Sequence, residues 1–279
     1  MLFFRSVLFL IFFLVLTLLT QVGGIIWLAG YWIFRIDFFK RSFNRSQRIL
    51  FQTGWYLFIS LLIIPFLATL FGRVPMPFGF NGPLKPRTLL TVLCNRHYVR
   101  PQLRTIVSEH AHRLAEAHDG LHINYLDANF PFSLALPFGY FRKGFPLLPH
   151  LSHNDGRKLD IAFVYRDAAT GKLSNGTPSA IGYGISEEPL PGEYDRPAAC
   201  SGSASYSFIH DHWPQGAKAD HRFDPVITRQ MINGFARDER ISKVLLEPHL
   251  TQRLKLVSPK IKPVQCGSVR HDDHVHIQL

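Results

Sequence analysis

Two groups of histidine and aspartate residues have spacings that could bind a metal ion. His153 precedes Asp160 by seven positions, and His271, His274 and His276 fall within six residues. Neutral imidazole nitrogens and carboxylate oxygens are zinc ligands, and a catalytic zinc takes three protein ligands while one position stays open for water. His153, Asp160 and one of the later histidines supply that number. The sequence therefore predicts a hydrolytic zinc centre.

Both groups fall on segments that are expected to be β-strands. Residues 274–279 alternate polar and apolar side chains, so that His274 and His276 share one face while the apolar side chains point into the core. Residues 158–165 are a second strand candidate, in which Asp160 has apolar neighbours. A carboxylate without a partner is costly in such a strand, and metal ligation would remove that cost.

Other histidines provide alternatives that the sequence leaves open. His210 and His212 form a second His-x-His pair, but they stand in a segment that is expected to be a loop. His150 and His249 are further candidates, and their expected role is local hydrogen bonding. An aspartate within a strand is also more often ion-paired than bound to a metal.

The two main groups match a pair of motifs in their order and spacing. The sequence LSHNDGRKLD at residues 151–160 resembles the His-x6-Asp motif of the penicillin-insensitive murein endopeptidases, and RHDDHVH at residues 270–276 resembles their closing His-x2-His-x-His motif. These enzymes belong to a wider group with the lysostaphin-type enzymes, the D-Ala-D-Ala peptidases and the hedgehog domains. The resemblance covers residues 145–279.

The resemblance implies a fold and a set of site residues. It implies an α+β fold in which a small antiparallel sheet with helices carries the zinc site. Zinc would be bound by His153, Asp160 and His276. His274 would be the acid/base group beside the metal, and His271 would be a further active-site histidine. Asp272 or Asp273 is expected to fix the tautomer of a neighbouring imidazole.

The function that the resemblance implies is hydrolysis of peptide bonds in peptidoglycan by zinc-activated water. A D,D-carboxypeptidase or dipeptidase with the same zinc site is one alternative, and a non-catalytic, zinc-stabilised module that binds wall peptides is another. Which peptide bond is cleaved and the oligomeric state are left open. A serine hydrolase is disfavoured because the sequence contains no Gly-x-Ser-x-Gly elbow.

The N-terminal quarter of the chain has the composition of a membrane segment. Residues 6–34 contain no charged side chain, and residues 49–71 form a second apolar run. A helix needs about 20 apolar residues to cross the hydrocarbon layer. The sequence therefore predicts a two-helix transmembrane hairpin over residues 1–72, with a bend at Gly23 and Gly24.

The distribution of charge predicts how the hairpin is oriented. Between the two apolar runs stand five basic residues, namely Arg35, Lys40, Arg41, Arg45 and Arg48. Loops rich in Lys and Arg stay in the cytoplasm. The chain is therefore expected in a bacterial inner membrane, with its C-terminal domain facing the periplasm.

The rest of the chain is expected to be a linker at residues 73–87 followed by a zinc metallopeptidase domain at residues 88–279. Beyond residue 72 the chain has 25 basic and 19 acidic residues, a modest positive charge that favours an anionic polymer as partner. Nucleic acid is disfavoured because no basic run with interleaved aromatic residues is present. Residues 170–222 lack periodicity and are expected to be a long surface excursion.

The periodicity of apolar residues, together with capping and helix-ending residues, predicts the other elements of the domain. Helices are expected over residues 102–118, 225–236 and 248–256, the second of them with Asp224 as its N-cap. Further strands are expected over residues 121–126 and 243–247. The sequence does not decide whether any two of the three cysteines, Cys94, Cys200 and Cys266, form a disulfide.

Overall fold

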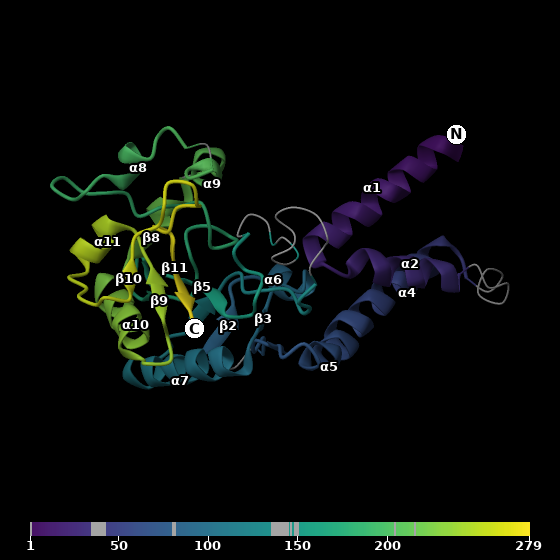
Figure 1. Ribbon diagram of the computed structural model, residues 1–279, viewed down its shortest axis with the longest axis horizontal. Coiled ribbons are helices and arrows are strands. Elements are labelled where there is room, and N and C mark those ends of the chain that lie inside the picture. The colour runs from purple at the N-terminus through teal and green to yellow at the C-terminus, as the bar shows by residue number, and fades with distance from the viewer. Residues whose placement is uncertain are drawn as a thin grey trace. The chain divides into compact units, whose positions relative to one another are not determined.

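The computed structural model shows the chain as two compact units, each built from several segments (Figure 1). The first unit consists of Met1–Pro75, Leu90–Arg100 and Asn129–Gly156, and the second of Met76–Leu89, Pro101–Ala128 and Arg157–Leu279. The structure describes residues 2–34, 43–79, 82–134, 145, 147, 151–203, 205–214 and 216–279.

Apolar helices make up most of the first unit. They are α1 (Leu2–Thr20), α2 (Gly23–Ile33), α4 (Arg45–Phe58), a π-helical turn (Ile59–Ile63) and α5 (Ile64–Thr69). The last three join into one helix, Arg45–Thr69, whose 25 residues are long and apolar enough to cross a membrane. Among the described residues it is the one helix that meets this condition.

The predicted two-helix hairpin is therefore not shown, because the first apolar run is broken at Gln21. The backbone of Gln21 has a φ of 69°, which a helix does not allow, and its side-chain amide donates a 2.8 Å hydrogen bond to the Phe132 carbonyl instead. The apolar helices on the two sides of this break, Ser6–Thr20 and Gly23–Ile33, are too short to count as spans. The break comes directly before the glycines at which a bend was predicted. Most of the basic loop, residues 35–42, lies outside the described residues.

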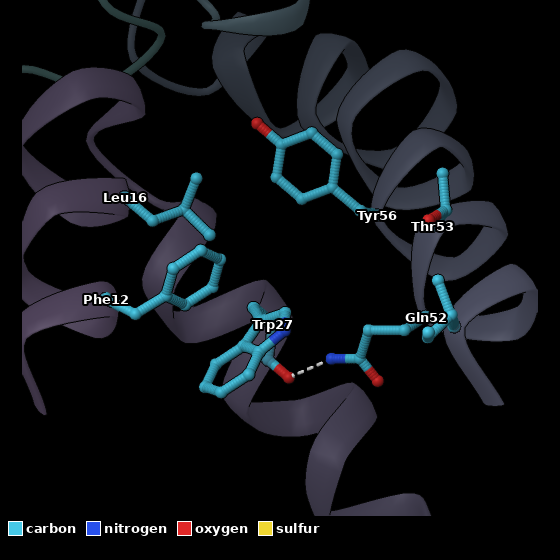
Figure 2. Close-up of a pocket in the computed structure, with 7 residues that line it drawn as sticks. Phe12, Leu16, Trp27, Gln52, Thr53 and Tyr56 are labelled. Carbon is cyan, nitrogen blue, oxygen red and sulfur yellow. Dashed lines mark hydrogen bonds between the residues drawn. The ribbon is translucent and has the colours of Figure 1, made fainter. Parts of the chain in front are cut away.

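Helix α4 is held against α2 by two polar side chains in otherwise apolar surroundings. Gln52 Nε2 donates a 2.5 Å hydrogen bond to the Trp27 carbonyl, and Trp55 Nε1 donates one of 3.1 Å to the Ile26 carbonyl. Figure 2 shows the first of these bonds beside a pocket between α1, α2 and α4. The pocket is lined by Phe12, Leu16, Trp27, Ile49, Gln52, Thr53 and Tyr56.

A six-stranded sheet forms the centre of the second unit (Figure 1). In spatial order its strands are β10 (Ile261–Lys262), β9 (Lys243–Leu245), β11 (His274–Gln278), β5 (Lys158–Ala162), β4 (Ile123–Tyr125) and β2 (Leu84–Pro86). The four central strands pair antiparallel, as predicted, while β10 and β2 pair parallel at the two edges. The α+β class is confirmed, and the sheet is mixed at its edges.

The register between β11 and β5 decides which side chains share a face. His276 is paired with Asp160, and His274 with Ala162. Successive side chains of a strand point to opposite faces, so Asp160, His274 and His276 lie on one face of the sheet. The intervening residues Leu159, Ile161, Val275 and Ile277 are completely buried and form core on the other face.

The predicted helices of the second unit are confirmed as α7 (Pro101–Ala117), α10 (Pro225–Arg237) and α11 (Pro248–Arg253). Asp224 caps α10 as predicted, because its carboxylate accepts hydrogen bonds from the N–H groups of Val226 and Ile227. Helices α7 and α10 are joined where His110 contacts Asp238 at 3.1 Å. The strand predicted over 158–165 ends at Ala162, and the chain continues into another sheet.

Residues 170–222, predicted as a long surface excursion, contain short helices and strands and several buried side chains. With the preceding β6 (Tyr165–Asp167), this segment forms a three-stranded sheet from β7 (Leu173–Ser174) and β8 (His221–Phe223), and it contains α8 (Arg196–Ala199) and α9 (Phe208–His212). Tyr183 and Tyr206 are buried. A disulfide between Cys200 and Cys266 ties the segment to the chain just before His271. The excursion is thus packed and covalently anchored.

The remaining short elements complete the described chain. They are β1 (Val74–Pro75), β3 (Tyr98–Val99), α6 (Leu89–Leu93) and a 3-10 turn (Gly216–Asp220). Strands β1 and β3 pair antiparallel within the first unit.

Candidate metal centre

Asp160 is the central residue of the candidate site in the second unit. It is completely buried in β5, where its backbone exchanges hydrogen bonds with Leu126 and Asp127. Each oxygen of its carboxylate has a close partner: Oδ1 lies 2.8 Å from Nδ1 of His276, and Oδ2 lies 2.9 Å from the hydroxyl of Tyr183. The paired strands therefore place a carboxylate and an imidazole within reach of one ion.

Two further imidazoles lie beside this pair. Asp160, His271 and His274 offer ligand atoms that all lie within 4.8 Å of one another, and all three residues are buried. The ring of His271 has its centre 4.5 Å from that of His274 and 5.6 Å from that of His276. The three histidines predicted from the closing motif are thus brought together around the predicted aspartate.

Nδ1 of two of these rings lies within hydrogen-bond distance of an acceptor, which defines the tautomer of each ring in its neutral form. Nδ1 of His271 lies 2.8 Å from the Val269 carbonyl, which can only accept, so Nδ1 carries the proton and Nε2 has the lone pair. Nδ1 of His274 contacts the carboxylate of Asp273. Asp273 is therefore the aspartate that orients an imidazole, in agreement with the sequence prediction, which left the choice between two. The other candidate, Asp272, pairs with Arg270 instead.

The local field favours positive charge at the site. Burial alone would lower the pKa of His274, but the neighbouring carboxylates of Asp160 and Asp273 raise that pKa to about 9. A field that stabilises an imidazolium ion also attracts a metal cation, because both interact with the same carboxylates.

The donor set fits a transition-metal ion such as zinc. Imidazole nitrogen and carboxylate oxygen are the donors that zinc takes, whereas magnesium and calcium prefer oxygen ligands alone. In metal sites, a carboxylate or a backbone carbonyl commonly holds the second nitrogen of a histidine in place. Asp273 makes such a contact with His274, and the Val269 carbonyl makes one with His271. The buried histidine and aspartate groups could therefore hold a metal ion.

The third predicted ligand, His153, belongs to the other compact unit. It is buried there, with 1% of its surface exposed, three residues before the unit ends at Gly156. Its ligation of the metal stays a prediction.

The alternative histidines have other contacts in the described chain. In α9, Nε2 of His210 lies 2.9 Å from a carboxylate oxygen of Glu188, and Nδ1 of His212 lies 2.7 Å from the Phe208 carbonyl. His249 contacts the Glu187 carbonyl at 2.7 Å, as expected for a local hydrogen-bonding role. His150 lies outside the described residues.

No model of a known protein family and no curated protein matches this chain. The resemblance to the murein endopeptidases thus rests on the two motifs.

One residue of the site was missed by reasoning from the sequence. Tyr183 comes from the segment that was expected to be a surface excursion, 23 residues after the aspartate that it contacts. The one local signal is that glycines flank it on both sides, at Gly182 and Gly184. Such a signal is too common to indicate a site.

Proposed function

We propose that this chain is a membrane-anchored, zinc-dependent peptidase that hydrolyses peptide bonds in peptidoglycan. The observation that carries the proposal is the strand register that pairs His276 with Asp160, with 2.8 Å between Nδ1 and Oδ1. These two residues are the second and third ligands of the proposed set. His153, assigned by the His-x6-Asp motif, is proposed as the remaining one.

Zinc bound by these residues would lower the pKa of a water ligand to about 7 and would polarise the scissile carbonyl. His274 is the proposed acid/base group. Asp273 holds the Nδ1 side of this ring, and Nε2 lies 3.7 Å from Oδ2 of Asp160. A bound cation would offset the carboxylates of Asp160 and Asp273 that raise the pKa of this ring, so the ring would be neutral in the loaded site. Nε2 would then accept the proton of the attacking water and return it to the leaving amine.

His271 is proposed to stabilise the developing oxyanion. Since its Nδ1 proton is engaged by the Val269 carbonyl, Nε2 can donate a hydrogen bond only when the ring is an imidazolium ion. The role therefore requires a protonated His271 during the reaction. In its neutral form the same nitrogen would accept hydrogen bonds only.

We propose that the chain lies in the bacterial inner membrane, anchored by a helical hairpin, with its second unit in the periplasm. The helix Arg45–Thr69 supports one crossing, and the broken pair α1 and α2 is proposed to form the other. The disulfide between Cys200 and Cys266 supports the compartment, because disulfides persist in the periplasm and are rare in the cytosol.

Digestion of crosslinked peptidoglycan tests the proposal. The full chain, purified in detergent and loaded with zinc, should release soluble crosslinked fragments, and a chelator should stop the release. Asp160→Ala should be inactive, whereas Asp119→Ala should match the wild type, because Asp119 is an exposed aspartate in the turn after α7.

The outcomes separate the related functions. Cleavage of free pentapeptide tails without cleavage of crosslinks would indicate a carboxypeptidase. Binding of wall peptides without turnover would indicate a binding module. Equal fragment release by the wild type and by Asp160→Ala would contradict the zinc site itself.

A further inference from the structure

The segment from residue 170 to residue 222 delivers a tyrosine hydroxyl to the candidate metal centre. The hydroxyl of Tyr183 lies 2.9 Å from Oδ2 of Asp160 and 3.0 Å from the backbone nitrogen of Asp127. The side chain is 7% exposed and packs with Leu126 and Ala162. A residue that is distant in sequence is thus built into the wall of the site.

The direction of both hydrogen bonds follows from the chemistry of the partners. The backbone N–H of Asp127 can only donate, so the Tyr183 oxygen accepts there. The single hydroxyl hydrogen therefore points to Asp160, whose ionised carboxylate can only accept. Tyr183 occupies one lone pair of Oδ2 and fixes the rotation of the carboxylate.

The two carboxylate oxygens thereby become different. Oδ2 carries the Tyr183 hydrogen bond and faces Nε2 of His274 at 3.7 Å, whereas Oδ1 faces Nδ1 of His276 at 2.8 Å. We propose that Tyr183 is a positioning residue that makes Asp160 a monodentate metal ligand through Oδ1, with His276 as the partner ligand and His274 outside the ligand set. This inference rests on the proposed zinc function.

The backbone around Tyr183 is shaped for this placement. Gly182 and Gly184 have φ values of +88° and +89°, a region that other residues rarely adopt. A Cβ atom on Gly182 would lie 2.2 Å from a methyl carbon of Leu126. The N–H of Gly184 donates a 2.5 Å hydrogen bond to Asp273, so the same turn contacts both the ligand and the residue that orients the proposed base.

The ring of Tyr183 makes a packing contact that is separate from the hydrogen bond of its hydroxyl group. It meets the ring of His274 edge-on, with centres 5.0 Å apart and an angle of 84° between the planes. Removal of the hydroxyl alone would keep this packing. Tyr183→Phe therefore isolates the hydrogen bond to Asp160.

Metal affinity is the direct test. The full chain in detergent is titrated with Zn²⁺ and with Co²⁺ against a coloured chelator, and the visible spectrum of the Co²⁺ form reports the coordination. Tyr183→Phe should bind both ions about ten- to a hundredfold more weakly than the wild type, as is typical when a partner of a metal ligand is lost. Gly182→Ala, which keeps the hydroxyl but displaces it, should weaken binding as well.

Tyr125→Phe is the matched control. Tyr125 is a buried tyrosine of β4 that pairs with Ile161 and so lies on the face of the sheet opposite to Asp160. Its substitution should leave metal affinity unchanged. The melting temperature of each variant in chelator reports the fold separately from the metal.

Equal metal affinity of Tyr183→Phe and the wild type would overturn the inference alone. A wild-type chain that binds neither ion would overturn the proposed function and this inference together. If the wild type binds metal more tightly than Tyr183→Phe but does not digest peptidoglycan, the result would support the inference and contradict the proposed substrate.

Discussion

Nδ1 of His276 lies 2.8 Å from Oδ1 of Asp160, and the two residues are register partners across β11 and β5. His276→Ala should therefore remove a proposed metal ligand without disturbing the sheet, because the ring lies on the site face. We expect the bound zinc, measured by elemental analysis after dialysis, to fall from about one ion per chain to near zero. His112→Ala, an exposed histidine of α7, is the control, and it should retain the metal.

His274→Ala separates catalysis from metal binding. Because His274 is proposed to transfer protons and not to bind zinc, the variant should retain its zinc and lose about 10²- to 10⁴-fold in turnover. Asp273→Asn should have a smaller effect, since it loosens the imidazole without removing it. Zinc content and the rate of crosslink hydrolysis are measured on the same samples. Loss of zinc from His274→Ala would place that residue among the ligands instead.

The sequence predicted the parts of the site that follow from local pattern. Polar and apolar alternation in β11 identified the shared face of His274 and His276, and an aspartate within an apolar strand marked Asp160. Their pairing across the sheet is a property of strand register, which no local pattern contains. The resemblance, through its two motifs, supplied the expectation that Asp160 and His276 bind the same ion.

Tyr183 and the break at Gln21 could not be predicted for a physical reason. Both depend on contacts between distant segments: Tyr183 with Asp127 and Asp160, and Gln21 with Phe132, 111 residues away. A polar side chain in an apolar run has no local sign that it will bond a distant carbonyl. The contact between Gln21 and Phe132 and the contacts of Tyr183 were therefore not predicted.

The disulfide between Cys200 and Cys266 is expected to contribute to stability through the 66-residue separation that it spans. A crosslink that closes a loop of this length removes chain entropy from the unfolded state worth roughly 4 kcal/mol, and strain often reduces the gain. Reduced protein, with its thiols alkylated, should therefore melt at a lower temperature than oxidised protein. A Cys94→Ser variant should show the same difference, because Cys94 is not part of this disulfide.

Asp224→Ala should destabilise the second unit by about 1–2 kcal/mol through loss of the α10 cap. The carboxylate accepts two backbone N–H groups and also pairs with Arg166 at 2.7 Å. Asp224→Asn retains a cap acceptor and loses the charge, so it should cost less. Thermal unfolding of the two variants measures the difference, and equal losses would assign the effect to the ion pair.

Asp238 is expected to give the second unit an acid-sensitive contribution to stability. The hydrogen bond from Arg240 holds the pKa of Asp238 below its usual value of 3.8, against the opposing effect of burial, and His110 adds to the lowering. A folded-state pKa that is depressed gives stability above the unfolded pKa, and this stability is lost as the pH falls through the folded value. Asp238→Asn should therefore be less stable than the wild type by on the order of 1 kcal/mol at pH 7, given the partly exposed arginine.

The same comparison at low pH provides the control. As the pH falls below the usual value of 3.8 toward the depressed folded-state pKa of Asp238, the contribution of the charge is progressively lost, so the difference in melting temperature between Asp238→Asn and the wild type should shrink. A difference that persists unchanged between pH 7 and pH 2 would show that the carboxylate charge contributes nothing.

Strand β11 is hydrogen-bonded along both edges, to β9 on one side and β5 on the other, and its apolar side chains are completely buried. Amide groups in such a strand exchange with solvent only when much of the domain opens. The side chains proposed to bind the metal on β11 and β5 are therefore held in place by the sheet and do not need an ion to position them. Small zinc-dependent domains that are unfolded without their metal behave differently. If the chain binds zinc as proposed, removal of the metal with a chelator should leave a folded apoprotein, and readdition of zinc should restore the site without a refolding step.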